Sequence, residues 1–148
     1  MNINSFKNLL LKAQISEIQY YQDFKLSLIL KNNIYELWFL EFTILSDWYL
    51  EGSKEWDNFI PPIIYKGEYE DAKKAYFLMH LSYNNSIINV TIMDDYTLKI
   101  QFENNWVLVV PSYSEYFDLA WIFENTLNSN EFYLAYNSND KLLLTSKY

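Results

Sequence analysis

Apolar and polar residues alternate in two stretches of the chain that resemble one another. Aligning the chain with itself at an offset of 72 residues pairs residues 15–38 with residues 87–110 without a gap. Asn32 and Asn33 fall on Asn104 and Asn105 in this alignment, and Asp23 falls on Asp95. Alternation at period two is typical of a half-buried strand, so each stretch is predicted to form antiparallel strands.

Each stretch is predicted to fold as a short meander. The first strands are expected near residues 15–20 and 87–93, followed by turns at Asp23 and at Asp94-Asp95. Asparagine tolerates positive φ, so Asn32-Asn33 and Asn104-Asn105 are predicted to form two-residue hairpin turns. Apolar residues resume after each pair, which indicates a further strand.

A helix is predicted before each meander. Ser5 can cap a helix whose apolar stripe is Phe6, Leu9, Leu10 and Ala13. Residues 67–83 place acids in the first turn, then Lys73 and Lys74, and a stripe of Tyr69, Ala72, Tyr76 and Met79 on one side. The connector between the halves, residues 51–69, holds Pro61-Pro62, which forbids regular helix or central strand.

One helix and one meander cannot bury their shared apolar face, whereas two related halves can. We therefore predict a single α+β domain over residues 1–148, with antiparallel sheet packed against helices. Its two pseudo-repeated helix-plus-meander halves are expected at about residues 5–50 and 75–123. The pattern leaves open whether the strands form one sheet or two.

The charge balance argues against several partners. The net charge is −8, and all 11 basic residues are lysine, so the chain has no bidentate arginine fork for phosphate. An acidic surface repels nucleic acid and anionic membranes. With no membrane-spanning apolar stretch and no signal peptide pattern at the N-terminus, the protein is expected to be cytoplasmic.

The acidic residues concentrate in two windows. Residues 41–71 hold eight acids against Lys54 and Lys66, and residues 94–131 hold seven acids against Lys99 alone, so each window carries a net charge of −6. Such windows are either ordinary solvated faces or the footprint of a basic partner.

The residues needed for familiar catalytic chemistry are scarce. The chain has no cysteine, two glycines and one histidine, His80, which lies in an apolar run and is expected to be a packed or capping imidazole. Asp94-Asp95 could bind a cation, but backbone hydrogen bonding at a turn also selects aspartate. We therefore predict a protein that is not an enzyme, with no catalytic residues, no metal and no cofactor.

Three tryptophans follow recognisable patterns. Trp48 and Trp121 each come shortly after a meander and are predicted to pack in the core. Trp56 lies between Glu55 and Asp57 in the connector, so it is either an exposed anchor for a partner or a side chain tucked over a sheet edge.

Residues 75–123 contain, in order, AYFLMHL, SIINVTI, DDY, TLKIQF, ENN, WVLVVP and DLAWIF. This order of helix, strand, turn, strand, polar turn, strand and tryptophan resembles immunity proteins of bacterial toxin systems, including contact-dependent inhibition and other polymorphic toxins. The resemblance implies a small cytoplasmic protein that neutralises a cognate toxin by occluding its active site, without catalytic residues of its own.

The resemblance fits the composition, because an acidic and aromatic-rich inhibitor would associate quickly with a basic toxin such as a nuclease. The connector and the start of the second helix carry the predicted partner-binding residues, which are Glu51, Glu55, Trp56, Asp57, Glu68, Glu70 and Asp71. Two alternatives stay open. One is a small-ligand or sugar-binding module that uses surface aromatics, and the other is a structural subunit of a larger assembly.

Overall fold

The computed structural model describes residues 3–21, 25–32, 39–60, 69–115, 117–125, 131–136 and 141–146. The helices in these ranges are α1 (Ile3–Leu10), α2 (Lys54–Asp57) and α3 (Tyr69–Ser82). The strands are β1 (Gln14–Tyr21), β2 (Lys25–Lys31), β3 (Phe39–Ile44), β4 (Tyr49–Glu51), β5 (Ile87–Ile92), β6 (Leu98–Phe102), β7 (Val107–Val110), β8 (Leu119–Asn125), β9 (Glu131–Tyr136) and β10 (Lys141–Ser146).

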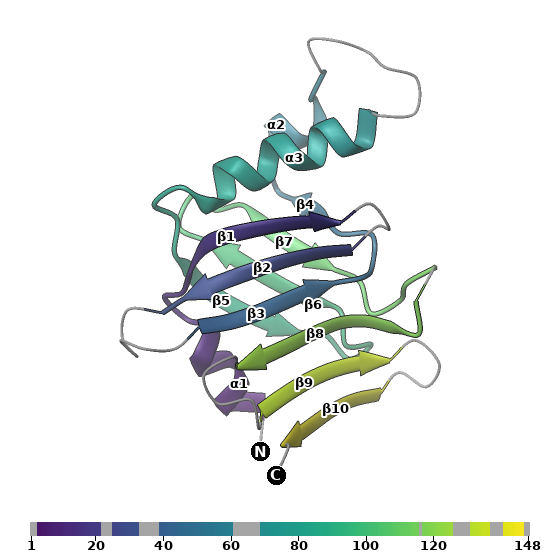
Figure 1. The fold of residues 1–148 in the computed structure, drawn as a ribbon. Coiled ribbons are helices and arrows are strands. Elements are labelled where there is room, and N and C mark those ends of the chain that lie inside the picture. The colour runs from purple at the N-terminus through teal and green to yellow at the C-terminus, as the bar shows by residue number, and fades with distance from the viewer. Residues whose placement is uncertain are drawn as a thin grey trace.

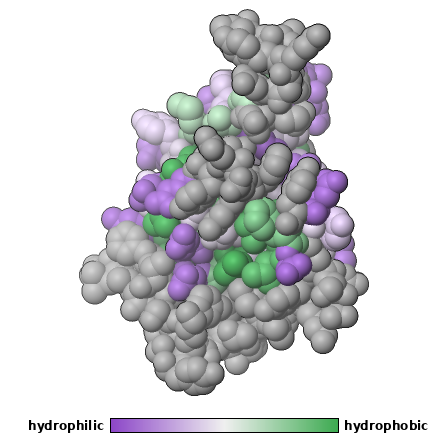
Figure 2. Space-filling model, turned by 45° about the vertical axis from the view of Figure 1, so that its right-hand side comes forward, coloured by the Kyte–Doolittle hydropathy of each residue, from purple (hydrophilic) through white to green (hydrophobic). Residues whose placement is uncertain are grey.

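The strands form two antiparallel sheets, and the predicted α+β fold class is confirmed. One sheet has six strands in the order β1-β2-β3-β8-β9-β10, and the other has four in the order β4-β7-β6-β5. Figure 1 shows the four-stranded sheet behind the six-stranded one, with α3 across one end of the two layers and α1 at the other. Figure 2 shows hydrophobic and hydrophilic residues beside one another in the middle of the molecule.

The chain exchanges strands between the two sheets. β1, β2 and β3 form a meander in the first sheet, and the next strand, β4, pairs with β7 in the second sheet. β5, β6 and β7 form the corresponding meander in the second sheet, and the next strand, β8, pairs with β3 in the first. The first meander is therefore extended by β8, which comes after the second meander in the chain, and the second meander is extended by β4, which comes after the first. This exchange of strands ties the two sheets together.

The sequence offset of 72 recurs in details of the structure. The ladder of β1 and β2 is irregular between Ile15 and Glu17, and that of β5 and β6 between Ile87 and Asn89. Gln14 Nε2 donates a hydrogen bond of 2.9 Å to Ser86 Oγ, its counterpart at separation 72. The offset ends at the third strand, because β3 begins at Phe39 after a longer connection than the one before β7.

The hairpin between β6 and β7 is one residue longer than predicted. Phe102 N donates to Trp106 O over 3.0 Å, and Asn105 N donates to Phe102 O over 2.9 Å. Residues 103–105 thus form the loop, and Asn105 adopts a φ of 68°. This is a three-residue loop whose last residue is left-handed, a position that asparagine tolerates better than most residues.

Asn32 has a different role from the predicted turn residue. Its side chain is buried, and Nδ2 donates to Leu9 O over 3.0 Å and to Leu11 O over 2.9 Å. These carbonyls lie at the end of α1, where backbone acceptors have no partner within the helix. Asn32 therefore caps α1, while its neighbour Asn33 lies outside the described residues.

The core lies between the sheets. Leu26, Leu28 and Leu30 of β2 are buried, as are Leu98, Ile100 and Phe102 of β6, and these six residues belong to one hydrophobic cluster. Phe42 and Phe123 stack across β3 and β8 with ring centroids 3.8 Å apart. Trp48 and Trp121 are 3% and 0% exposed, so their predicted core positions are confirmed.

Helix α3 buries the face opposite to the stripe found in the sequence. Phe77, Leu78 and Leu81 are buried, whereas Tyr76 and Met79 are 44% and 68% exposed. The sequence is apolar on both sides of this helix, so its periodicity alone did not determine which side packs inward.

Candidate partner-binding surface

The one-turn helix α2 is held in place by a cap at its start. Ser53 is 1% exposed, and its Oγ accepts a hydrogen bond of 3.1 Å from Trp56 N. Serine at this position satisfies a backbone N–H that has no partner within the helix. The preceding Gly52 has a φ of 76°, which an L-residue adopts only with strain. The cap fixes the orientation of α2, with Glu55 and Asp57 exposed and Trp56 buried.

Trp56 is not an exposed anchor. It is 7% exposed, and its ring lies 5.8 Å from that of Trp48 and 5.1 Å from that of Phe77. Lys73 Nζ lies 4.3 Å from the Trp56 ring centroid, close enough for a cation–π contact. This burial corrects the interpretation of Trp56 as a direct contact and agrees with the tucked alternative. Its contribution is to hold α2 against α3.

An aromatic cluster joins α2, α3 and the β6–β7 hairpin. Phe77 is fully buried, and its ring centroid lies 5.4 Å from that of Phe59 and 5.3 Å from that of Trp106. Phe59 also packs on Tyr76, with centroids 5.0 Å apart. Tilted and edge-on contacts at these distances are favourable beyond simple burial. The cluster makes the α3 end of the molecule a preorganised unit.

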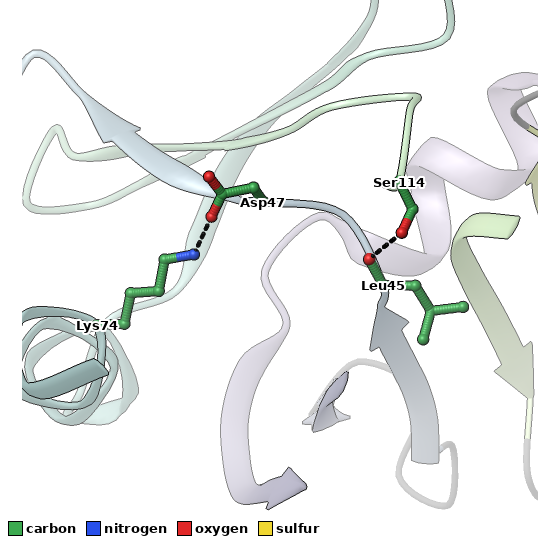
Figure 3. Close-up of polar contacts among 4 residues, drawn as sticks. All are labelled: Leu45, Asp47, Lys74 and Ser114. Atoms are coloured by element: carbon green, nitrogen blue, oxygen red, sulfur yellow. Dashed lines mark hydrogen bonds and ion pairs between the residues drawn. The ribbon is translucent and has the colours of Figure 1, made fainter. Parts of the chain in front are cut away.

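The connection between β3 and β4 is tied to two other parts of the chain (Figure 3). Asp47 forms an ion pair with Lys74 of α3, whose Nζ also lies 5.1 Å from the Trp48 ring centroid. Ser114 Oγ donates a hydrogen bond of 2.6 Å to Leu45 O. Because the Asp47 side chain is 93% exposed, water screens its pair with Lys74 and the pair adds little stability.

Glu51 of β4 already has a cation within reach. Its Oε2 lies 2.9 Å from Lys99 Nζ of β6, and the side chains of Lys99 and Glu51 are 34% and 51% exposed. The hydrogen bond and the negative charge of Glu51 raise the pKa of Lys99 above its ordinary value. A basic side chain of a partner would compete with Lys99 for Glu51, which lowers the net gain from that contact.

The structure brings part of the predicted site together. Glu51 on β4 and Glu55 and Asp57 on α2 are exposed acids in consecutive elements. Glu70 and Asp71 lie in the first turn of α3, where only the backbone is described, and Glu68 lies outside the described residues. Carboxylates in the first helical turn also suit the positive end of the α3 dipole.

The second acidic window is divided in space. Asp94 and Asp95 lie in the β5–β6 turn, whereas Glu103 lies in the β6–β7 hairpin at the opposite end of β6. Asp95 Oδ1 accepts a hydrogen bond of 3.0 Å from Thr97 N, which lowers the pKa of Asp95. The selection of Asp95 by turn geometry is therefore confirmed, and this window forms no single surface.

Several apolar residues on or near α3 are exposed, which was not predicted from the sequence. Ile60, Met79 and Tyr83 are 79%, 68% and 78% exposed. The available signal was the presence of apolar residues on two sides of α3, because a surface helix buries only one of them.

In the described part of the chain, His80 and the acids do not assemble a metal centre. His80 is exposed, its Nδ1 lies 2.9 Å from Tyr76 O, and its ring centroid lies 4.3 Å from that of Tyr76. Among the described residues, no three His, Cys, Asp or Glu side chains come together as metal ligands. Within the same ranges, no helix has both the length and the apolar character needed to cross a bilayer.

No protein-family model, curated protein or solved structure matches this chain. The likeness to immunity proteins therefore rests on the order of elements in the sequence. Because one fold can serve many functions, the function of this chain depends on the geometry and charge of its exposed residues.

Proposed function

We propose that the protein is an immunity protein that binds a basic bacterial toxin and occludes the active site of that toxin. The observation that supports this most directly is the run of exposed acids Glu51, Glu55 and Asp57 on consecutive elements of the α3 end. Glu68, Glu70 and Asp71 follow closely in the sequence and belong to the same proposed surface.

The support beneath these acids favours tight binding. Ser53 caps α2, and Trp56 anchors it to Phe77 of α3. Side chains on a fixed base lose less conformational freedom when they bind, so more of the contact energy appears as affinity. A short helix held in this way can present two carboxylates to the cations of a toxin.

The negative charge of the protein favours a basic partner and speeds association with it. The net charge is −8, and the surface stays acidic although Lys99 pairs with Glu51 and Lys54 lies in α2 with Glu55 and Asp57. A toxin that cleaves nucleic acid uses cationic groups to hold phosphates, and carboxylates can occupy the same groups. Opposite net charges steer the two proteins together, and added salt weakens this steering.

Occlusion requires binding and no chemistry from the inhibitor. Losing a buried, paired carboxylate at such an interface costs about 2 kcal/mol or more, which corresponds to about thirtyfold in affinity. A carboxylate at the rim would mainly slow association.

Co-expression tests the proposal. A basic protein encoded beside the gene for this chain would be produced in bacteria with the wild-type chain, with Glu51→Lys/Glu55→Lys/Asp57→Lys, or with the control Asp94→Lys/Glu103→Lys/Asp118→Lys. The control makes the same charge change at exposed acids elsewhere. We expect growth with the wild type and the control and growth arrest with the first variant, provided circular dichroism shows all three folded. Arrest with the wild type would contradict the function, and protection by the first variant would contradict the site.

A further inference from the structure

The outward side of α3 is exposed and uncharged. Its outer stripe consists of Ala72, Ala75, Tyr76, Met79 and His80, together with Tyr83 just beyond the helix. Tyr76, Met79 and Tyr83 follow the i, i+3, i+7 spacing of residues that anchor a helix in a partner. Aromatic side chains and methionine are also enriched, and charges depleted, at the centres of protein interfaces.

The described charged residues of α3, Lys73 and Lys74, do not belong to the outer stripe. Lys73 and Lys74 are partly buried against Trp56 and Trp48, and the acids Glu70 and Asp71 precede the stripe in the first turn. A basic partner would therefore gain no direct charge attraction on this face. A second copy of an acidic chain would meet no like charge there, although its other surfaces would repel.

The order of residues in the outer stripe is self-complementary. In a two-fold symmetric pair, residue i of one copy meets residue j of the other, and j meets i. If two α3 helices pack antiparallel about the point between Phe77 and Leu78, Ala72 faces Tyr83, Ala75 faces His80, and Tyr76 faces Met79. In the two outer pairs an alanine lies opposite a larger residue, and in the central pair Tyr76 packs on the flexible side chain of Met79. The antiparallel helix dipoles also oppose each other favourably.

We propose that a second copy of this chain covers the outer stripe of α3 and forms a two-fold symmetric homodimer. One helix face is smaller than the roughly 800 Å² per partner of a standard interface, so the dimer forms reversibly as concentration rises. Ile60, 79% exposed, follows Phe59, which packs on Tyr76, and it extends the apolar surface beside the stripe. The inference does not depend on the proposed function, because the acids of β4 and α2 lie outside the stripe.

Sedimentation equilibrium of the full chain over micromolar to millimolar concentrations tests the proposal. We expect a monomer–dimer equilibrium that Met79→Glu weakens about tenfold or more, because it buries a carboxylate in an apolar contact. Met93→Glu is the matched control, since Met93 is an exposed methionine away from α3. Tyr83→Ser and Tyr113→Ser form a second pair with the same design, because both tyrosines are more than half exposed.

A charge-swap experiment tests the antiparallel arrangement. Position 79 of one copy lies close to position 79 of the other across the two-fold axis, so Met79→Glu and Met79→Lys should each be monomeric alone and pair when mixed. A wild-type chain that stays monomeric at millimolar concentration would overturn the proposal and leave the face open for a different protein. A dimer that both stripe variants leave intact would also overturn it, as would the absence of pairing in the mixture.

Discussion

The two halves of the molecule share a framework and differ at one end. Each half has a helix, then two paired strands whose register is irregular at positions 72 residues apart in the two halves. A third strand and a further strand that joins the other sheet follow in each half. The halves differ in their helices, because α3 of the second half is 14 residues long where α1 is 8, and an aromatic cluster holds α2 against it. The shared strands build the two-layered core. The end of the molecule formed by α2 and α3 has no counterpart in the first half, and it carries the exposed side of α3 and, with Glu51 of β4, the candidate acidic surface.

The largest expected effect is a loss of stability at the two places where the chain passes from one sheet to the other, β4 and β8. Trp48 lies beside the start of β4, and Trp121 lies in β8, so each tryptophan sits where its half joins the other sheet. Trp48→Ala and Trp121→Ala should each lower the free energy of unfolding by about 3–5 kcal/mol, because both remove a buried indole. Urea denaturation measures this, and a cost below about 1 kcal/mol for either variant would mean that the two places are not equivalent.

A smaller effect should separate the two asparagine positions that the sequence treats as equal. Asn32→Ala leaves the carbonyls of Leu9 and Leu11 without their buried donor, at a cost of about 1–3 kcal/mol. Asn104 is exposed, and its Oδ1 accepts from Trp106 N over 3.1 Å, so Asn104→Ala should cost less than about 1 kcal/mol. If thermal unfolding shows the same loss of stability for Asn32→Ala and Asn104→Ala, the two asparagines do not differ in their contribution.

The residues after each helix provide a further matched pair. Lys12 and Asn84 stand at the same offset and have φ values of 69° and 43°. Lys12→Gly should stabilise the fold by about 0.5–1 kcal/mol, because lysine is strained in the left-handed region, and Asn84→Gly should stabilise it less. Differential scanning calorimetry of both variants checks this order. Destabilisation by Lys12→Gly would mean that the strain is already compensated.

The smallest effect concerns pH. The folded-state pKa of Asp95 is lowered by the hydrogen bond from Thr97 N, so its contribution is present above the ordinary carboxyl pKa and is lost as pH falls through the folded value. Asp95 is exposed, and Asp95→Ala should cost less than about 1 kcal/mol at pH 7. The difference from wild type in unfolding midpoint should shrink in acid. A difference that grows instead would contradict this assignment.

Much of the framework followed from the pattern of residues. Alternation around Ile15–Ile18 and Ile87–Val90 predicted the first strand of each half, and the tryptophans were correctly placed in the core. The exchange of β4 and β8 between sheets was not predictable, because alternation shows that a strand has a buried face and does not identify its neighbour. The prediction of a hairpin turn at Asn32 was wrong for a similar reason, because its hydrogen-bond partner Leu9 lies in α1, far away in the sequence.

The candidate surface was predicted only in part. The exposure of the acids of α2 was expected from their charge, whereas the burial of Trp56 depends on Phe77 and Lys73 of α3. The charges on either side of Trp56 therefore could not decide between the exposed and the tucked alternatives. Ala72, Tyr76 and Met79 of the outer stripe were recognised in the sequence as one side of a helix. Their exposure was not predicted, because α3 has apolar residues on the opposite side as well and the pattern does not show which side packs inward.

The most direct test of the account is a kinetic titration of the cognate toxin at low and high salt. It compares the wild type with Glu51→Lys/Glu55→Lys/Asp57→Lys and Asp94→Lys/Glu103→Lys/Asp118→Lys. We expect the first variant to bind at least about thirtyfold more weakly, the second to associate somewhat more slowly with nearly unchanged dissociation, and salt to slow association of the wild type. If neither variant loses affinity and salt leaves the association rate unchanged, the acids of β4 and α2 are not the surface that binds the toxin.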